Sequence, residues 1–285
     1  AFEEVSLLHK IVTRIRDNGA AVLFISHRME EIFRFGDRMT VLKDGCVVDT
    51  VDMKSVTSDD VIKMMVGREL SDIFPKKSIG SGQTPLFEVR NVSVPHYVHD
   101  ASFQVMPGEV LGIVGESGSG KSTVAKMITH LTEPTAGEIF LMEKNITHAR
   151  GKNLREIYRE MQMVFQTPAE SFDPRCTLGD GIGESLRNMG ISKKETRNRV
   201  EKLLLTCGLT PEYADRYPHQ VSGGECQRAA IARALAVKPR VLICDEATSA
   251  LDVTVQKQIM ELLQKLKKEN QLSFLLICHD LALVQ

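Results

Sequence analysis

Residues 115–123 carry the stretch on which the rest of the chain depends, Gly115-Glu116-Ser117-Gly118-Ser119-Gly120-Lys121-Ser122-Thr123. It fits the phosphate-binding pattern G-x-x-x-x-G-K-[ST] without a mismatch. An apolar run at 109–114 precedes it and predicts a buried strand. The residues after it have the spacing of an amphipathic helix, with apolar side chains at Val124, Met127, Ile128 and Leu131. In this strand-loop-helix context, backbone N–H groups and the helix N-terminus converge on phosphate, so we expect a nucleotide site.

Two residues of this loop have a predicted chemical role. Lys121 would reach the β- and γ-phosphates, and the Ser122 hydroxyl would bind Mg²⁺. The alternative is a flexible Gly/Ser turn before an ordinary helix. The flanking strand and helix favour the nucleotide site.

The composition of the 285 residues bounds the class of protein. The chain is 42% hydrophobic and 26% charged with a net charge of −1, so no basic field indicates nucleic acid as a partner. It contains no signal peptide and no run near 18 apolar residues, so we expect any link to a membrane to come through a partner. Its six cysteines lack C-x-x-C spacing. They predict buried, reduced thiols, and neither a disulfide framework nor a zinc site.

An internal repeat suggests how the chain is organised. The sequence LFISH at 23–27 matches LLICH at 275–279, an offset of about one large α/β domain. We therefore expect residues 1–73 to be the tail of one copy and 86–285 to be most of a second. Residues 74–85 are rich in turn formers and predict a linker. On this interpretation the chain is a fragment of a longer tandem protein.

In the first part of the chain, the pattern predicts a helix that ends at Asn18-Gly19 and a buried strand at 21–25. A helix at 29–35 and a hairpin at 39–48 follow. Strands at 86–94 and 101–105 then lead toward the phosphate loop.

The second part alternates strands and helices. Between about 150 and 237 the pattern is helical, with S-x-x-E capping boxes that begin at Ser192 and Ser222. A strand at 240–244 and a helix after Asp252 complete the pattern. This alternation predicts a mainly parallel sheet covered on both sides.

Asp245 and Glu246 follow the strand at 240–244, at the end of the strand where ligands collect in α/β sheets. A paired carboxylate there can divide the work. Asp245 would orient Mg²⁺, and Glu246 would polarise the attacking water as general base. The alternative is a solvated strand end, since acidic pairs are common on surfaces. The phosphate loop upstream favours the catalytic interpretation.

Within residues 86–285, several segments together resemble the ATP-binding cassette (ABC) ATPases in order and spacing: 115–123, Gln166, 221–225, 241–246, 249–252 and His279. The resemblance implies a P-loop NTPase (RecA-like) α/β fold with a mainly parallel sheet. It also implies an antiparallel β subdomain and an α-helical signature subdomain. Many NTPases share the phosphate loop, whereas the Ser-Gly-Gly signature ahead of a helix is specific to this family.

The resemblance also implies residue roles. Gln166 is similar to the glutamine that contacts Mg²⁺ and water and senses the membrane partner. Ser222, Gly223 and Gly224 resemble the signature that closes on the γ-phosphate of a facing domain. Asp252 resembles the D-loop aspartate, and His279 the switch histidine at the γ-phosphate.

Three further positions bear on the nucleotide site. Tyr97 is a candidate for stacking on adenine, with a half-buried loop aromatic as the alternative and His96 and His99 as competitors. The signature departs from the family pattern at Val221 and at Glu225, where Leu and Gln are usual. Glu225 keeps the capping box but adds a carboxylate near bound phosphate, which is unfavourable unless the side chain points away.

The two parts of the chain resemble different branches of the family. Residues 24–70 resemble the first-half tail of tandem ATPases from ribose/galactose-type sugar importers. From Gly115 onward the sequence is more similar to dipeptide, oligopeptide or nickel importer ATPases. The cargo therefore stays open between these classes.

The function implied is ATP hydrolysis by the nucleotide-binding subunit of an ABC importer, with ATP and Mg²⁺ as cofactors. The implied partners are transmembrane permease subunits, a second nucleotide-binding domain and an extracytoplasmic solute-binding protein. The place implied is the cytoplasmic face of the membrane. One alternative is an ABC ATPase of translation or DNA repair without a membrane partner. The other is an ATP-binding fragment with little turnover by itself.

Overall fold

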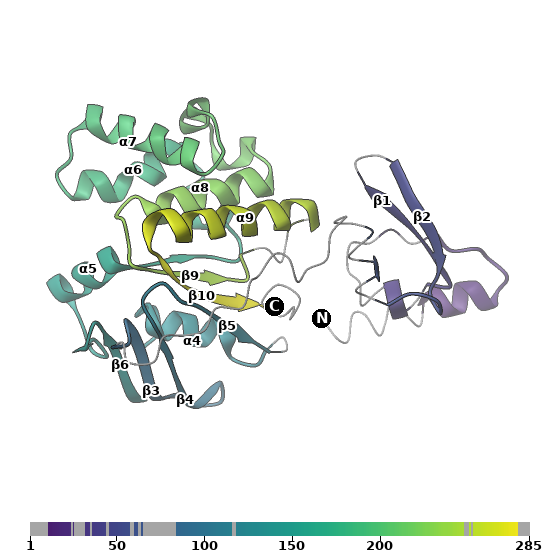
Figure 1. Ribbon diagram of the computed structural model, residues 1–285, viewed down its shortest axis with the longest axis horizontal. Coiled ribbons are helices and arrows are strands. Elements are labelled where there is room, and N and C mark those ends of the chain that lie inside the picture. Colours follow the sequence, from purple (N-terminus) through teal and green to yellow (C-terminus); the bar gives the residue numbers. More distant parts are fainter. Residues whose placement is uncertain are drawn as a thin grey trace. The chain divides into compact units, whose positions relative to one another are not determined.

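The chain divides into two units, with the main break between residues 76 and 77. In the first unit, the computed structural model describes residues 11–23, 25, 32–34, 36–43, 46–57, 60–61 and 64. Beyond the break it describes residues 84–115, 118–247, 251 and 253–278 (Figure 1). Each unit has strands and a hydrophobic core of its own.

A parallel sheet forms the centre of the second unit. Its four strands are β5 (Val110–Val114), β10 (Ser273–Cys278), β9 (Val241–Asp245) and β8 (Met161–Val164), in that order. Every neighbouring pair is parallel. All five residues of β9 are buried, as expected for a strand covered on both faces. The predicted parallel sheet is therefore confirmed.

Helices cover both faces of this sheet. Helix α4 (Lys121–Ile128) lies on one face, and α8 (Gly223–Leu235) and α9 (Val253–Asn270) lie on the other (Figure 1). The predicted helix after the phosphate loop is confirmed, but it ends at Ile128. Leu131 lies beyond the helix end and is 54% exposed, so its predicted place in the apolar stripe is wrong.

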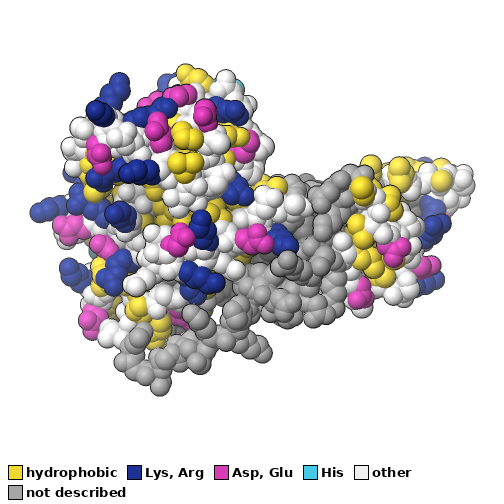
Figure 2. All heavy atoms as spheres, turned by 45° about the horizontal axis from the view of Figure 1, so that its top comes forward, with side chains coloured by type: hydrophobic (Ala, Val, Ile, Leu, Met, Phe, Trp, Pro, Cys, Tyr) yellow, Lys and Arg dark blue, Asp and Glu magenta, His cyan; other side chains and the backbone are white. Residues whose placement is uncertain are grey.

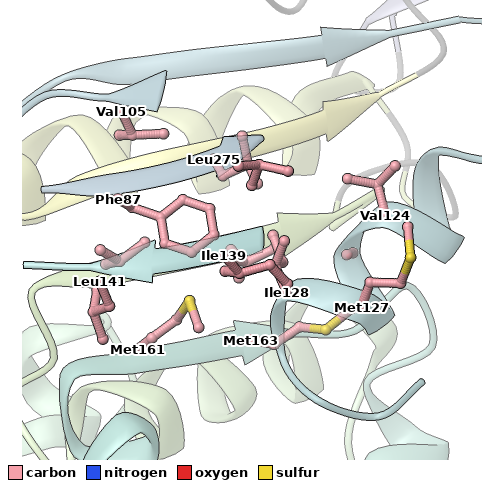
Figure 3. Packing of buried hydrophobic residues seen from close by; sticks show 14 of the residues in the cluster. Phe87, Val105, Val124, Met127, Ile128, Ile139, Leu141, Met161, Met163 and Leu275 are labelled. Atoms are coloured by element: carbon pink, nitrogen blue, oxygen red, sulfur yellow. The ribbon is translucent and has the colours of Figure 1, made fainter. Parts of the chain in front are cut away.

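An antiparallel sheet supplies the next layer. Its strands are β4 (Val98–Val105), β3 (Phe87–Val94), β6 (Ala136–Leu141) and β7 (Lys144–Asn145), in that order. Apolar side chains of this sheet, of α4 and of the parallel sheet pack into one core (Figure 3). Fully buried members include Phe87, Met127, Ile128, Ile139, Met161 and Leu275. The core fixes α4 between the two sheets.

The predicted helical region contains α5 (Gly151–Glu160), α6 (Leu178–Asn188) and α7 (Lys193–Thr206), followed by α8. Helices α6, α7 and α8 contact one another. The region also contains strand β8, which the sequence pattern missed. On the face shown in Figure 2, positive and negative side chains are interspersed. In the part of the chain that is described, no helix has the length and apolar character needed to cross a membrane.

The two predicted capping boxes differ. At α7, Ser192 Oγ accepts a hydrogen bond from Glu195 N at 3.3 Å, but the Glu195 carboxylate accepts from Arg199 Nε at 2.8 Å. Only half of that predicted box therefore forms. At α8 both halves form, between Ser222 and Glu225.

The first unit contains the predicted hairpin. Strands β1 (Arg38–Lys43) and β2 (Cys46–Asp52) pair antiparallel, and Met39 and Val41 are buried on one face. Residues 11–17 are helical, and the helix ends as predicted at Asn18-Gly19, where Gly19 has a φ of 84°.

The predicted buried strand at 21–25 is wrong for the residues described. Residues 21–23 and 25 belong to no helix or strand, and the exposed fractions of Leu23 and Ile25 are 90% and 88%. An apolar run becomes a buried strand only where neighbouring strands accept its backbone hydrogen bonds. In the described part of the first unit, the only paired strands are β1 and β2.

Candidate nucleotide-binding site

The carboxyl ends of the four parallel strands bring the predicted residues to one edge of the sheet. β5 is followed by Gly115, β8 ends two residues before Gln166, and β9 ends at Asp245 with Glu246 next to it. Val114 pairs with Cys278, and Ile277 pairs with Asp245, so these ends lie in register. This is the edge at which α/β sheets bind ligands.

The phosphate loop folds around Lys121. The Lys121 Nζ donates to the Gly115 carbonyl oxygen at 2.6 Å and lies 3.4 Å from Ser119 Oγ. Gly118 and Gly120 have φ values of 84° and 90°, which glycine adopts readily and other residues rarely do. Helix α4 begins at Lys121 without a side-chain cap, so backbone N–H groups at its start are suited to an anion. Glu116 and Ser117 lie outside the described residues.

Tyr97 adjoins this loop through its backbone. A Cβ atom at Gly120 would lie 2.5 Å from the Tyr97 carbonyl oxygen, so glycine is needed for this approach. The Tyr97 side chain is 63% exposed. An exposed aromatic beside the phosphate loop is compatible with stacking on a base, and this role stays a prediction.

Ser122 and Asp245 meet although they are far apart in the sequence. Ser122 Oγ donates to Asp245 Oδ1 at 3.0 Å. Asp245 is buried, and its burial raises the pKa of the carboxyl group. The Ser122 hydrogen bond opposes this rise, and the charge of Glu246 adds to it.

This pair fits a divalent cation. A hydroxyl and a carboxylate are the oxygen ligands that Mg²⁺ prefers, and a cation would offset the burial of the Asp245 charge. Among the described residues, no three His, Cys, Asp or Glu side chains converge as a metal site. A site with few protein ligands is typical of Mg²⁺ that is also held by phosphates and water.

Glu246 lies within reach of Gln166. Gln166 Nε2 donates to Glu246 Oε2 at 2.8 Å, and Glu246 N donates to the Ile277 carbonyl oxygen at 2.9 Å. Glu246 has a φ of 46°, a conformation that glutamate seldom adopts. Strained backbone of this kind persists where surrounding contacts hold it, and it is frequent at functional sites. Gln166 thus holds the carboxylate that the sequence proposed as general base, and the bond to Ile277 holds the backbone that carries it.

The signature residues form the exposed start of α8. Ser222 and Gly223 are exposed, and the described hydrogen bonds of Ser222 stay at this helix start. A Cβ atom at Gly224 would lie 2.6 Å from Val255 Cγ1 in α9, so only glycine fits without a shift. These bonds do not join the signature to the phosphate loop of the same chain.

The carboxylate of Glu225 is turned back onto protein groups. Its Oε2 accepts from Ser222 N at 2.7 Å, and its Oε1 accepts from the Tyr213 hydroxyl. The Tyr213 hydrogen bond, followed by the Ser222 backbone, lowers the pKa of Glu225. Tyr213 could not be predicted as a partner of Glu225, because no local sequence pattern connects residues twelve positions apart.

Asp252 and His279 lie outside the described residues. β10 ends at Cys278, one position before the predicted switch histidine. The structure thus brings together the phosphate loop, Gln166, Asp245 and Glu246, and it places the signature at the start of α8.

Comparison with known proteins identifies the family. The sequence profile described as "ABC transporter" matches residues 98–249. The chain belongs to the ABC transporter family.

Two curated relatives of this ABC protein are named oligopeptide transport ATP-binding protein OppF. That of Bacillus subtilis is 49% identical over 192 residues, covering 66% of this chain and 63% of the relative. That of Haemophilus influenzae is 45% identical over 190 residues, covering 66% and 57%. A third relative, the glutathione import ATP-binding protein GsiA of Escherichia coli K12, is 34% identical over 326 aligned positions, covering 99% of this chain and 52% of the relative. The chain therefore spans between about half and two thirds of the length of these relatives.

Solved structures share the fold. CbiO1 from Clostridium perfringens, described as part of the ABC transporter complex cbiONQ, has a TM-score of 0.62 at 28% identity and covers 70% of this chain and 80% of its own. The ATP-binding cassette MJ0796, in a dimeric post-hydrolysis state with ADP and phosphate, has a TM-score of 0.62 at 31% identity, covering 69% and 89%. The expected cassette fold is confirmed, and the ABC protein contains a cassette of the ATP-hydrolysing type.

None of the relatives named above is a sugar importer, so they give the sugar-importer interpretation of residues 24–70 no support.

Proposed function

We propose that this ABC protein hydrolyses ATP to drive the import of short peptides or peptide-like solutes. The observation that carries the proposal is the meeting of three segments at one sheet edge. Ser122 contacts Asp245 at 3.0 Å, and Gln166 contacts Glu246 at 2.8 Å. Support for the cargo class comes from relatives that are named for oligopeptide and glutathione transport.

In the proposed site, the chain's residues position the triphosphate and neutralise its charge. The phosphate loop and Lys121 bind the phosphates. Ser122 and Asp245 would hold Mg²⁺ with Gln166 nearby, and this ion would supply charge neutralisation at the phosphate oxygens. Glu246 accepts a proton from the attacking water, and Gln166 fixes the orientation of its carboxylate.

A second cassette completes the proposed site. Ser222 and Gly223 are exposed at the start of α8, and Gly224 beside them is half-buried. A helix start of this kind is suited to the γ-phosphate of a facing cassette. Asp252 and His279 keep the roles that the family resemblance implies. The proposed partners are permease subunits and an extracytoplasmic solute-binding protein, and the proposed place is the cytoplasmic face of the membrane.

The proposed domain order follows the repeat in the sequence. Residues 1–73 are the tail of a first cassette, 74–85 are a linker, and 86–285 are most of a second cassette. The alignment with the glutathione import protein supports this order, because it covers 99% of the chain and so includes both parts.

The test is Glu246→Gln in the full-length protein. Loss of the general base should lower kcat at least about 100-fold, while the Kd for Mg·ATP changes less than about threefold. Turnover is measured by phosphate release, and binding by a fluorescent ATP analogue. In cells that lack the gene, the unsubstituted protein should restore uptake of a labelled tripeptide, and the variant should not.

Glu261→Gln is the matched control, because Glu261 is an exposed glutamate of α9. It should keep both turnover and uptake. Full turnover by Glu246→Gln would refute the assigned base. Restored uptake of ribose or nickel, without peptide uptake, would refute the cargo class.

A further inference from the structure

Arg233 of α8 is a partly buried cation with unusual partners. Its Nη1 donates to the Ser171 carbonyl oxygen, and its Nη2 donates to Ser171 Oγ at 2.8 Å. Among the described residues, no carboxylate lies at ion-pair distance from it. Burial lowers the pKa of its guanidinium group. Moving a cation partly out of water is unfavourable unless polar groups compensate for it, and for Arg233 the compensating hydrogen bonds come from Ser171.

Phe172 completes the contact. The Arg233 guanidinium carbon lies 4.3 Å from the centroid of the Phe172 ring, which is within cation–π range. On the side of α6, a Cβ atom at Gly181 would lie 2.6 Å from Phe172 Cδ1. The ring is 5% exposed. Phe172 is therefore packed against both α6 and α8, which contact each other (Figure 1).

The segment between Gln166 and Phe172 is stiffened by its own hydrogen bonds. Ser171 Oγ donates to the Pro168 carbonyl oxygen at 2.7 Å, and Thr167 Oγ1 donates to Glu170 at 3.0 Å. Residues Ala169–Ser171 form a turn of 3-10 helix. A short, internally bonded segment transmits displacement of one end to the other better than a flexible loop does.

The two ends of this segment are held by different parts of the cassette. Gln166 contacts Glu246 at the sheet edge, whereas Ser171 and Phe172 contact α6 and α8. We propose that Arg233 and Phe172 clamp residues 166–172 to the helical region, so that the position of Gln166 at Glu246 follows that region. This inference rests on the proposed function. Arg233 and Phe172 are positioning residues, which act through Gln166.

The test compares Arg233→Met (R233M) in two backgrounds of the full-length protein. R233M should lower kcat about tenfold in the otherwise unsubstituted protein, with the Kd for Mg·ATP within about twofold. In a protein that already carries Gln166→Ala, R233M should change kcat less than about twofold, because the residue through which the clamp acts is gone. Phe172→Leu keeps the apolar fill but loses the aromatic ring, and it should show the same dependence on background.

Arg228→Met is the matched control. Arg228 lies in the same helix and donates to the Cys207 carbonyl oxygen at 2.9 Å and to Gln258 at 3.1 Å, away from residues 166–172. It should lower the unfolding temperature but keep kcat within about twofold.

Three results would overturn the clamp: an equal loss of kcat in both backgrounds, no loss in either, or a loss confined to nucleotide affinity. If R233M fails to fold, Phe172→Leu carries the same comparison. Absence of turnover in the unsubstituted protein would remove the proposed function and the clamp together. Normal turnover that is insensitive to both substitutions would remove the clamp alone.

Discussion

Asp245 is a buried carboxylate, and its surroundings in the fold disfavour the charged form. The carboxylate is 5% exposed and has the charge of Glu246 next to it. Ser122 supplies one hydrogen bond, and Lys121 and Lys126 supply attraction, but burial dominates and raises the pKa of Asp245. A residue whose charged form is disfavoured in the folded protein lowers stability at the pH where it is ionised. A loss of stability of this kind is tolerated where the charged group has a function.

The raised pKa of Asp245 makes the stability of the protein depend on pH. Because the folded protein binds the Asp245 proton more tightly than the unfolded chain does, unfolding free energy is lost as the pH rises above about 4, the ordinary value of Asp. Asp245→Asn removes the ionisation and keeps an acceptor for Ser122. Without nucleotide at neutral pH, it should raise the unfolding temperature by about 2–4 °C for each kcal/mol recovered, and this gain should shrink toward pH 4. Differential scanning fluorimetry measures both.

Asp100→Asn is the control, since Asp100 is exposed and an asparagine tolerates its φ of 50°. It should leave the unfolding temperature unchanged. Asp245→Asn should also lose the stabilisation that Mg²⁺ adds to bound ATP. An unfolding temperature that falls at neutral pH, or a gain that grows as the solution is acidified, would contradict the argument.

Among the elements, those with a local signal were predictable from the sequence. The strand-loop-helix around Lys121 carries a complete motif, and α9 carries a long stripe with helical spacing. The capping box at the start of α8 could be predicted because its two partners, Ser222 and Glu225, lie within four residues of sequence. Asp245 and Glu246 could be placed because a continuous apolar run, residues 241–244 of β9, precedes them. In each case, a few neighbouring residues determine the structure.

The rest depended on contacts that no local pattern contains. Strand β8 is four residues long, too short to show a period, and the sheet on its flank decides its conformation. Residues 21–25 carry a strand-like run, yet those described are unpaired. The Glu195 carboxylate could accept a hydrogen bond either from the backbone N–H of Ser192 or from Arg199, and it accepts from Arg199. Tyr213 and Arg233 act across the fold, so only the structure shows them.

The hydrogen bonds at the start of α8 stabilise that helix. Glu225→Ala removes the acceptor for Ser222 N and for the Tyr213 hydroxyl. The loss should destabilise the second unit by about 1 kcal/mol, or roughly 2–4 °C in unfolding temperature. Glu225→Gln, the residue usual in the family, keeps an acceptor and should lose less than half as much. An equal loss for both variants would show that the charge matters more than the cap.

At the scale of the whole molecule, the six thiols report on both units. Cys207, Cys226, Cys244 and Cys278 are buried, as the sequence analysis expected, but Cys46 and Cys176 are exposed, so the expectation was wrong for these two. Burial raises the pKa of Cys207 and Cys244 to about 12 and that of Cys226 to about 11. Since the thiolate is the reactive form, these three thiols are protected from reagents in two ways: they are inaccessible, and they stay protonated.

Maleimide labelling of the native protein at pH 7.5 should therefore modify two thiols quickly, and the others only after unfolding. Intact mass gives the number, and Cys46→Ser and Cys176→Ser identify the sites. Cys46 is the first residue of β2, and the next two residues of this strand, Val47 and Val48, are 62% and 45% exposed. If Cys46 reacts in this chain but is protected in the full-length protein, a further part of that protein covers the hairpin, as the proposed first cassette would. If Cys46 reacts equally fast in this chain and in the full-length protein, residues 38–52 are not the tail of a first cassette. The proposed domain order then fails, but the proposed nucleotide site at Lys121 is unaffected.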